Sequence, residues 1–189
     1  MTHASPPAAP GPILASTAPL PAWLAAELRS DHAGETGAVM IYRGILVLAR
    51  EPALVDFARR HMATEQGHLD LIEQVLAPAQ RSRLLPIWRV AGFLTGFLPG
   101  LFGPRAVYAT IDAVETFVDH HYQQQLDRLD AEGIEPRLRA VLAQCQAEEV
   151  HHRDEAREAT GRPPGLLLRA WAWVVGTGSA AAVSAAKRI

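Results

Sequence analysis

The stretch "EEVHHRD", residues 148–154, places two carboxylates directly before two histidines and so contains two Glu-x-x-His pairs. Glu149 and His152 share a helical seam whose other members are apolar, whereas Glu148 and His151 share a seam of charged and amide side chains. A helix in a globular protein buries its apolar seam. The sequence therefore predicts a helix whose Glu149 and His152 point into the interior.

A second inward Glu-x-x-His pair occurs at Glu65 and His68, and Glu35 and Glu115 each occupy the inner stripe of a further helical stretch. Glu35 and Glu65 are equidistant from a break at residue 50. Glu115 and Glu149 are likewise equidistant from a turn at residue 132. Antiparallel pairing therefore brings all four carboxylates to one depth, about 22–26 Å from the turns at 1.5 Å per residue.

Carboxylates buried without compensation are costly or become protonated. Two divalent metal ions would balance four of them, with neutral histidines completing the ligand shells. One Glu from each of two helices plus Glu-x-x-His from each of the other two is the ligand set of ferritin-like di-iron and di-manganese proteins. The predicted metal ligands are Glu35, Glu65, His68, Glu115, Glu149 and His152. Mixed nitrogen and oxygen ligation favours iron or manganese. The alternative is a set of salt-bridged or surface carboxylates that bind no metal.

The hydrophobic pattern has a period of 3.6 residues from Ala22 almost to the end of the chain, with no useful period-2 alternation. The predicted fold is all-α, a ferritin-like four-helix bundle with two additional apolar helices. We expect residues 1–21 to be a disordered Ala/Pro-rich tail and residues 22–189 to form a single domain. Proline and glycine breaks predict helices at residues 22–49, 52–78, 86–100, 105–131, 136–160 and 165–187.

The composition excludes several classes of function. The net charge is -2, from 18 basic and 20 acidic residues that we take to be spread along the chain, so no nucleic acid is expected as a partner. Cys145 is the sole cysteine, which rules out an internal disulfide and any site built from several thiolates. No Lys or Arg precedes Arg29, so neither a secretory signal nor a transit peptide is expected, and the sequence predicts a cytoplasmic protein.

Several residues near the predicted ligands have secondary roles in this interpretation. His61 shares the stripe of Glu65 and is interpreted as a core residue or a neighbour of the ligands. Asp31 and Glu148 are expected to orient ligand histidines through their ring N–H groups. The segment "HAGETG", residues 32–37, follows no strand, so it is not interpreted as a phosphate loop. Its glycines are expected to allow close helix approach or to leave room for substrate.

Two apolar stretches, residues 84–103 and 165–189, contain tryptophans and isolated arginines. In the first, the longest uncharged run is too short to cross a bilayer of about 30 Å. The second contains Arg169 and several small residues, and we expect it also to fall short of a span. We interpret both as membrane-docking helices at headgroup level, with ordinary helices covering the bundle as the alternative. Docking would favour a lipid-like substrate.

The motifs "LRSDHAGETGAVMIYRG", "EQGHLDLIE", "DAVETFVDHHY" and "EEVHHRDEA" resemble those of the demethoxyubiquinone hydroxylases of the Coq7 family. The similarity continues through "LLPIWRVAGF" and the C-terminal "KRI", and so covers the chain after its N-terminal tail. Thr36 departs from the family, which often has an aromatic residue after the first ligand glutamate. We expect this difference to alter the shape of the pocket and not the metal ligands.

The resemblance implies a di-iron monooxygenase that uses two Fe ions and O₂ to hydroxylate the ring of a polyprenylated demethoxy-benzoquinol in ubiquinone biosynthesis. It implies external electrons, with NADH as the donor, and proton or electron transfer by His121 and Tyr122, which match a family His-Tyr pair. The implied partners are the quinol substrate, a membrane surface and other ubiquinone-biosynthesis proteins, and an oligomer is compatible with it. The implied location is peripheral, on the cytoplasmic face of the cell membrane.

Two rival functions share the same scaffold. A ferritin-like iron-binding protein or ferroxidase would need no organic substrate. It would need a polar exterior and a cage interface. Another di-iron hydroxylase or a manganese catalase would keep the metal ligands and change the reaction. Affinity for membranes and for a quinone separates the first rival from the hydroxylase, and peroxide assays separate the catalase.

Overall fold

The computed structural model describes residues 20–161 and 163–189. Within these ranges all regular structure is helical, which confirms the predicted all-α class. The N-terminal tail expected at residues 1–21 lies, up to residue 19, outside the described residues. The helices are α1 (Ala22–Leu48), α2 (Pro52–Glu73), α3 (Leu85–Gly100), α4 (Pro104–Glu132), α5 (Pro136–Thr160) and α6 (Leu166–Ala186), with a short 3-10 helix η1 (Pro78–Gln80) between α2 and α3.

Proline and glycine set most of the helix ends. Pro52, Pro104 and Pro136 are the first residues of α2, α4 and α5, a position where the missing N–H of proline costs no hydrogen bond. Gly133 ends α4 in the left-handed conformation, with φ of 63°, which a residue without a side chain adopts freely. These breaks confirm the helix starts that the sequence predicts.

The predicted end of the second helix at residue 78 is wrong, because α2 ends at Glu73. Ala77 precedes Pro78 and has ψ of 145°. The ring of a proline disfavours helical backbone in the residue before it, so the helix cannot run through Ala77. The chain instead makes a turn and then enters η1.

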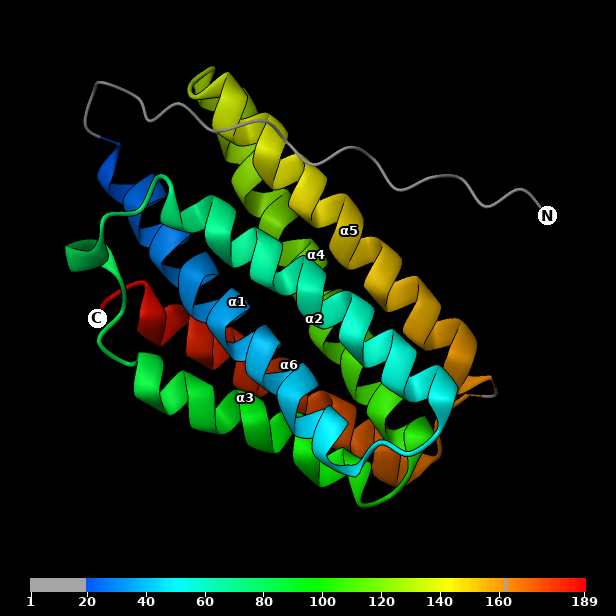
Figure 1. The fold of residues 1–189 in the computed structure, drawn as a ribbon. Helices are drawn as coiled ribbons and strands as arrows, with labels where there is room; N and C mark the ends of the chain where they lie inside the picture. Colours follow the sequence, from blue (N-terminus) through cyan, green and yellow to red (C-terminus); the bar gives the residue numbers. More distant parts are fainter. Residues whose placement is uncertain (1–19, 162) are drawn as a thin grey trace.

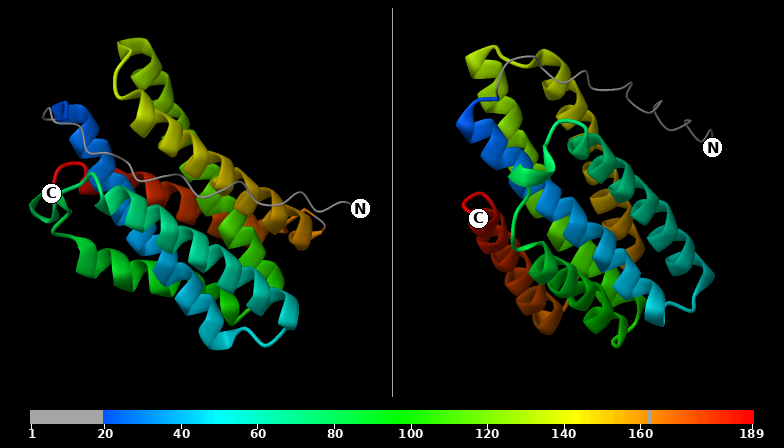
Figure 2. Two further views of the ribbon diagram at one scale, coloured as in Figure 1. Left: turned by 45° about the horizontal axis from the view of Figure 1, so that its top comes forward. Right: turned by 60° about the vertical axis from the view of Figure 1, so that its left-hand side comes forward.

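Four helices, α1, α2, α4 and α5, form the bundle, and α3 and α6 lie together along one side of it (Figure 1, Figure 2). Helix α3 packs mainly on α1, and α6 packs mainly on α4. The contact between α1 and α3 is made by backbone: a Cβ on Gly96 would overlap the carbonyl of Ile41, and one on Gly92 would overlap that of Gly37. Both helices therefore pack against the bundle with one face.

Two apolar clusters fill the bundle, one toward each end. One contains Ile45, Phe57 and Ile111, beside the α1–α2 loop. The other contains Leu28, Ile72 and Leu142, toward the α4–α5 turn. In α1, α2, α4 and α5, the residues between the two clusters include the inward carboxylates and histidines. These inward polar side chains therefore lie in the middle of the bundle, between apolar packing toward each of its ends.

The outer faces of α3 and α6 expose large apolar side chains, among them Leu94, Leu98, Trp173 and Val174. In the described part of the chain, α6 alone is long and apolar enough to cross a membrane, with 21 residues and a hydropathy of 1.4. The expectation that Arg169 and the small residues make this stretch fall short of a span is therefore wrong by length and composition.

Candidate metal centre

All six predicted ligands are buried in the middle of the bundle, each at most 5% exposed. Their ligand atoms form two groups, each within 4.8 Å: Glu35, Glu65, His68 and Glu149 in one, and Glu65, Glu115, Glu149 and His152 in the other. Glu65 and Glu149 belong to both groups. The arrangement thus offers two adjacent positions for ions that share two carboxylates.

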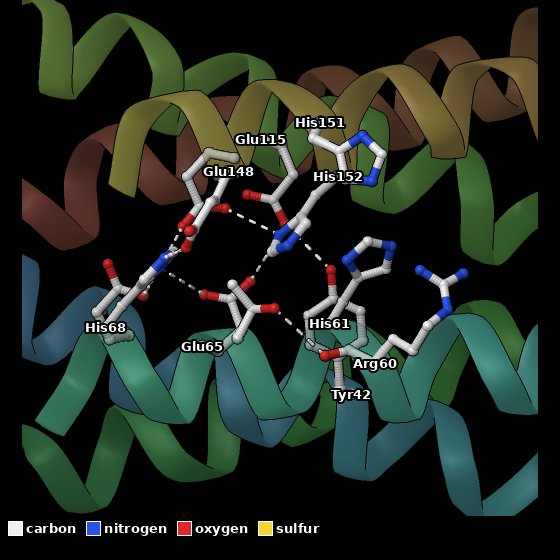
Figure 3. Close-up of polar contacts among 12 residues, drawn as sticks. Tyr42, Arg60, His61, Glu65, His68, Glu115, Glu148, His151 and His152 are labelled. Atoms are coloured by element: carbon white, nitrogen blue, oxygen red, sulfur yellow. Dashed lines mark hydrogen bonds and ion pairs between the residues drawn. The ribbon is translucent and has the colours of Figure 1, made fainter. Parts of the chain in front are cut away.

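Both histidines present Nδ1 to the carboxylates. His68 Nδ1 lies 3.0 Å from Glu149 Oε1 and 3.7 Å from Glu65 Oε2. His152 Nδ1 lies 3.2 Å from one oxygen of Glu65 and 3.2 Å from one oxygen of Glu149. We call the six predicted ligands the metal cluster. In Figure 3, His152 points into this cluster, whereas His151 lies on its outer side. The His151 side chain is 70% exposed. The structure therefore selects the Glu149–His152 pair as the inward one.

The electrostatics of these side chains are unbalanced. Burial raises the pKa of Glu35 to about 8 and raises the pKa of Glu115 well above its ordinary value. Burial acts against protonation of His152, but the nearby carboxylates of Glu149 and Glu65, each 3.2 Å from its Nδ1, outweigh it and raise its pKa to about 10. Bound protons therefore neutralise part of the negative charge of these carboxylates. Metal ions would displace those protons, because ligand histidines bind as neutral imidazoles.

The cluster also contains buried polar atoms without hydrogen bonds. They include both oxygens of Glu65, one oxygen of Glu149 and Nδ1 of His152. A buried acceptor without a partner costs free energy, so several of them facing one another require compensation. Divalent cations supply it, and the donor set of carboxylate oxygens and imidazole nitrogens fits iron or manganese. The residues present therefore fit a dinuclear metal site.

Hydrogen bonds from neighbouring side chains fix several of these groups. Glu148 Oε2 lies 2.6 Å from His68 Nε2, so Glu148 makes the contact with a ligand histidine that the sequence suggested. The hydroxyl of Tyr122 donates to Glu35 at 2.6 Å. The hydroxyl of Tyr42 lies 3.4 Å from Glu115. Sequence reasoning missed this last contact, although Tyr42 lies seven residues after Glu35 on the same inner stripe.

The expected role of Asp31 is wrong. Its carboxylate lies 2.9 Å from Nε2 of His121, which is not among the predicted ligands, and accepts a hydrogen bond from Gln125 at 2.8 Å. A position on the inner stripe of α1 does not say which helix it faces, and Asp31 faces α4 rather than the histidines of α2 and α5. Gln125 was not singled out, although it follows His121 by four residues, which places both on one face of α4.

His61 is buried and lies beside the cluster, with its Nε2 2.9 Å from Glu155. Its ring contacts that of His152, with centroids 4.0 Å apart. It belongs to neither group of ligand atoms. This placement agrees with the interpretation of His61 as a neighbour of the ligands.

A cavity of about 360 Å³ lies between the bundle and the α3–α6 layer. At its inner end it is lined by carboxylates of the cluster: Glu35, Glu65, Glu115 and Glu149. His121 and Tyr122 also line it, so the structure brings the two predicted catalytic residues to the same space as the predicted ligands. The other walls are mainly apolar and include Trp88 of α3 and Trp171 of α6. Such an apolar cavity with a few polar groups is typical of a small-molecule site.

The helical bundle and its buried set of four carboxylates and two histidines place the chain in the ferritin-like class of proteins. Within that class the family is also defined, because the family model described as "Ubiquinone biosynthesis protein COQ7" matches residues 22–186. The chain belongs to the COQ7 family.

Curated relatives agree with this assignment. A Rhodospirillum rubrum protein named 3-demethoxyubiquinol 3-hydroxylase is 41% identical over 130 residues, which is 67% of this chain and 60% of that protein. A Caenorhabditis elegans protein named NADPH-dependent 3-demethoxyubiquinone 3-hydroxylase, mitochondrial, is 31% identical over 86% of this chain and 88% of its own length. The rat protein of the same name is 35% identical over 69% of this chain. The chain spans less than two thirds of the Rhodospirillum and rat relatives.

Proposed function

We propose that this protein is a di-iron monooxygenase that hydroxylates the ring of a polyprenylated demethoxy-benzoquinol in ubiquinone biosynthesis. The observation that carries this proposal is the apolar cavity that ends on four buried carboxylates. A ring bound there lies against the side chains that hold the metal. The names of the relatives give the substrate, because those proteins are called demethoxyubiquinol or demethoxyubiquinone hydroxylases.

The proposed ligands of the two iron ions are the six residues of the cluster, with Glu65 and Glu149 shared between the ions. When bound, the iron would supply the reduction of O₂ that ring hydroxylation requires. The chain's own residues hold the ligands in place: Glu148 orients His68, and the Tyr122 hydroxyl fixes Glu35. Tyr122 is thereby a candidate for moving a proton between the cavity and the cluster.

The external electrons come, in this proposal, from a reduced nicotinamide nucleotide. The family resemblance implies NADH, whereas the names of the worm and rat relatives specify NADPH. Supplying each nucleotide in turn to the iron-loaded protein with its quinone substrate separates the two. Faster product formation with NADPH would correct the expectation from the sequence.

The polyprenyl tail implies a membrane, and the charges on the α3–α6 side support a peripheral position on it. Residues 74–111 and 163–189 contain no Asp or Glu and together hold seven Arg or Lys residues. The acidic residues are therefore not spread along the chain as the sequence analysis assumed. Arg81 pairs with Glu73 and Lys187 pairs with Glu27, so the excess of positive charge on this side is smaller than seven. A surface with an excess of positive charge that also exposes apolar side chains suits an anionic lipid surface. We propose the cytoplasmic face of the cell membrane as its location.

Expression in cells that lack the ring hydroxylase tests the proposed function. Conversion of the accumulated demethoxyubiquinone to the hydroxylated product is expected, with Glu149→Ala as an inactive control. Iron-loaded protein that leaves demethoxyubiquinone unchanged would refute the proposal. A ferroxidase would oxidise ferrous iron in the same cells without changing the quinone, and it has no need of an apolar cavity beside its metal ligands.

A further inference from the structure

Asp31 has an unusual environment for a carboxylate. Its side chain is fully buried, and it lines the cavity. Across residues 20–161 and 163–189, its one ion pair is with His121, and no Lys or Arg lies within 4.0 Å of it. A buried carboxylate without a permanent cation is stabilised when its partner becomes positively charged. The Asp31 carboxylate therefore has His121 as its sole ion-pair partner among the described residues in this wall of the cavity.

Three side chains lie around His121 Nε2, and the Asp31 carboxylate decides whether this nitrogen carries a proton. Gln125 Nε2 lies 3.1 Å from it, but its hydrogen bond goes to Asp31 Oδ1 at 2.8 Å. An ionised carboxylate only accepts, so His121 Nε2, 2.9 Å from Asp31 Oδ1, is the donor. Ser30 agrees with this assignment, because its hydroxyl donates to the Glu27 carbonyl at 2.7 Å and leaves its oxygen, 3.3 Å from Nε2, as an acceptor. In the described part of the protein, no hydrogen bond engages Nδ1 of His121. Nδ1 is therefore the ring nitrogen with a free lone pair.

The remaining charged groups near the ring do not provide a second such partner. Glu27 of α1 has an oxygen 3.8 Å from His121 Nε2, but Lys187 at the end of α6 lies 2.7 Å from the same carboxylate and neutralises it. Tyr122, the next residue in α4, is directed to Glu35. The charge that acts on His121 without compensation is that of Asp31.

We propose that Asp31 is a positioning residue that holds His121 with its proton on Nε2, so that His121 Nδ1 accepts a proton from a ring hydroxyl of the bound quinol. In this step the substrate O–H bond breaks and the Nδ1–H bond forms. The ring oxygen keeps the electron pair, and the imidazolium charge is balanced by Asp31. Gln125 Nε2, which donates to the same oxygen of Asp31, keeps that carboxylate in place. This inference rests on the proposed function, because the quinol is the proton donor.

The first test is the tautomer of His121. The full-length chain, loaded with Zn²⁺ as a diamagnetic ion and labelled with ¹⁵N in its histidines, is compared by NMR with Asp31→Ala, and His121→Gln assigns the signal. The wild type is expected to show one tautomer, with a pyridine-type Nδ1, and Asp31→Ala a mixture of both. Glu73→Gln is the matched control, because it removes a carboxylate 3.1 Å from another buried histidine, His32, and should leave the His121 signal unchanged. A wild-type His121 with its proton on Nδ1 would overturn the proposal.

The second test separates turnover from binding. In the iron-loaded enzyme, Asp31→Asn, which keeps the shape of the side chain, should lower kcat by about tenfold or more, since positioned acid–base groups contribute about 10²–10⁴-fold. The Kd of a short-tailed demethoxyubiquinone should change little in this variant. It is measured through the fluorescence of Trp88 and Trp171, which lie in the cavity wall. Wild-type kcat in both Asp31→Asn and Asp31→Ala would contradict the proposal. If the wild type hydroxylates no quinol, the proposed function fails, while the tautomer measurement still decides the pairing of Asp31 with His121.

Discussion

Replacing Glu149 should remove the metal centre, whereas replacing its neighbour Glu148 should only weaken it. Glu149 has oxygens in both groups of ligand atoms, so Glu149→Ala would take one ligand from each of the two proposed ions. Glu148 touches the centre through one contact, to the outer nitrogen of His68 at 2.6 Å. Loss of such an outer partner typically weakens metal binding by about 10–100-fold, or about 1.4–2.7 kcal/mol.

The measurement is anaerobic loading with ferrous iron, removal of unbound metal and elemental analysis, with a chelator titration for affinity. We expect two ions per chain in the wild type and in Glu148→Ala, with the weaker affinity in the variant, and fewer than one in Glu149→Ala. Glu149→Gln keeps the volume of the side chain, and circular dichroism of both variants shows whether the helices persist. Full iron content in a folded Glu149→Ala protein, or complete loss of iron in Glu148→Ala, would refute the assignment of Glu149 as an inward ligand and Glu148 as an outer partner of His68.

Three further predictions concern the surroundings of the centre. Tyr122→Phe removes the buried donor to Glu35 and should lower the free energy of unfolding by about 1–3 kcal/mol, measured by denaturant titration; an unchanged midpoint would mean that the 2.6 Å hydrogen bond contributes nothing. Gly96→Ala should destabilise the protein by about 1–3 kcal/mol because a Cβ would overlap the backbone of α1, whereas Gly67→Ala, where nothing lies within 4 Å, should be neutral or stabilising by up to about 1 kcal/mol; thermal melts of the two variants compare them directly. Burial lowers the pKa of His32 from 6.5, so the unfolded chain binds more protons there and stability should fall as the pH drops below about 6.5; His32→Gln should flatten this dependence in melts recorded between about pH 5 and pH 7, and a slope equal to that of the wild type would contradict it.

The positions of the ligands could be predicted from the sequence because each lies on a long helix with a clear apolar seam. Helical periodicity distinguishes Glu149 from Glu148, although the two are adjacent, since neighbouring residues differ by about 100° around the helix axis. The equal distances of Glu35 and Glu65 from their turn then predict their common depth. Both arguments use only the regular geometry of a helix, and the structure agrees with them.

Contacts between particular side chains were less accessible to the same reasoning. An inner stripe is wide enough to face more than one neighbouring helix, which is why Asp31 was assigned to the wrong histidine. The cavity could not be predicted either, because it depends on how α3 and α6 lie across the bundle. Both are apolar around much of their circumference, so their sequences contain no strong pattern that fixes which face turns inward.

The glycine contact between α1 and α3 has a mechanical consequence. Where Gly92 meets Gly37, and Gly96 meets Ile41, backbone rests on backbone, with no flexible side chain to absorb a displacement. A displacement of α3, the helix on the proposed lipid side, would therefore be passed to the α1 backbone that it contacts. Because α1 also contains Glu35, such a displacement would reach one of the predicted metal ligands through backbone contacts alone.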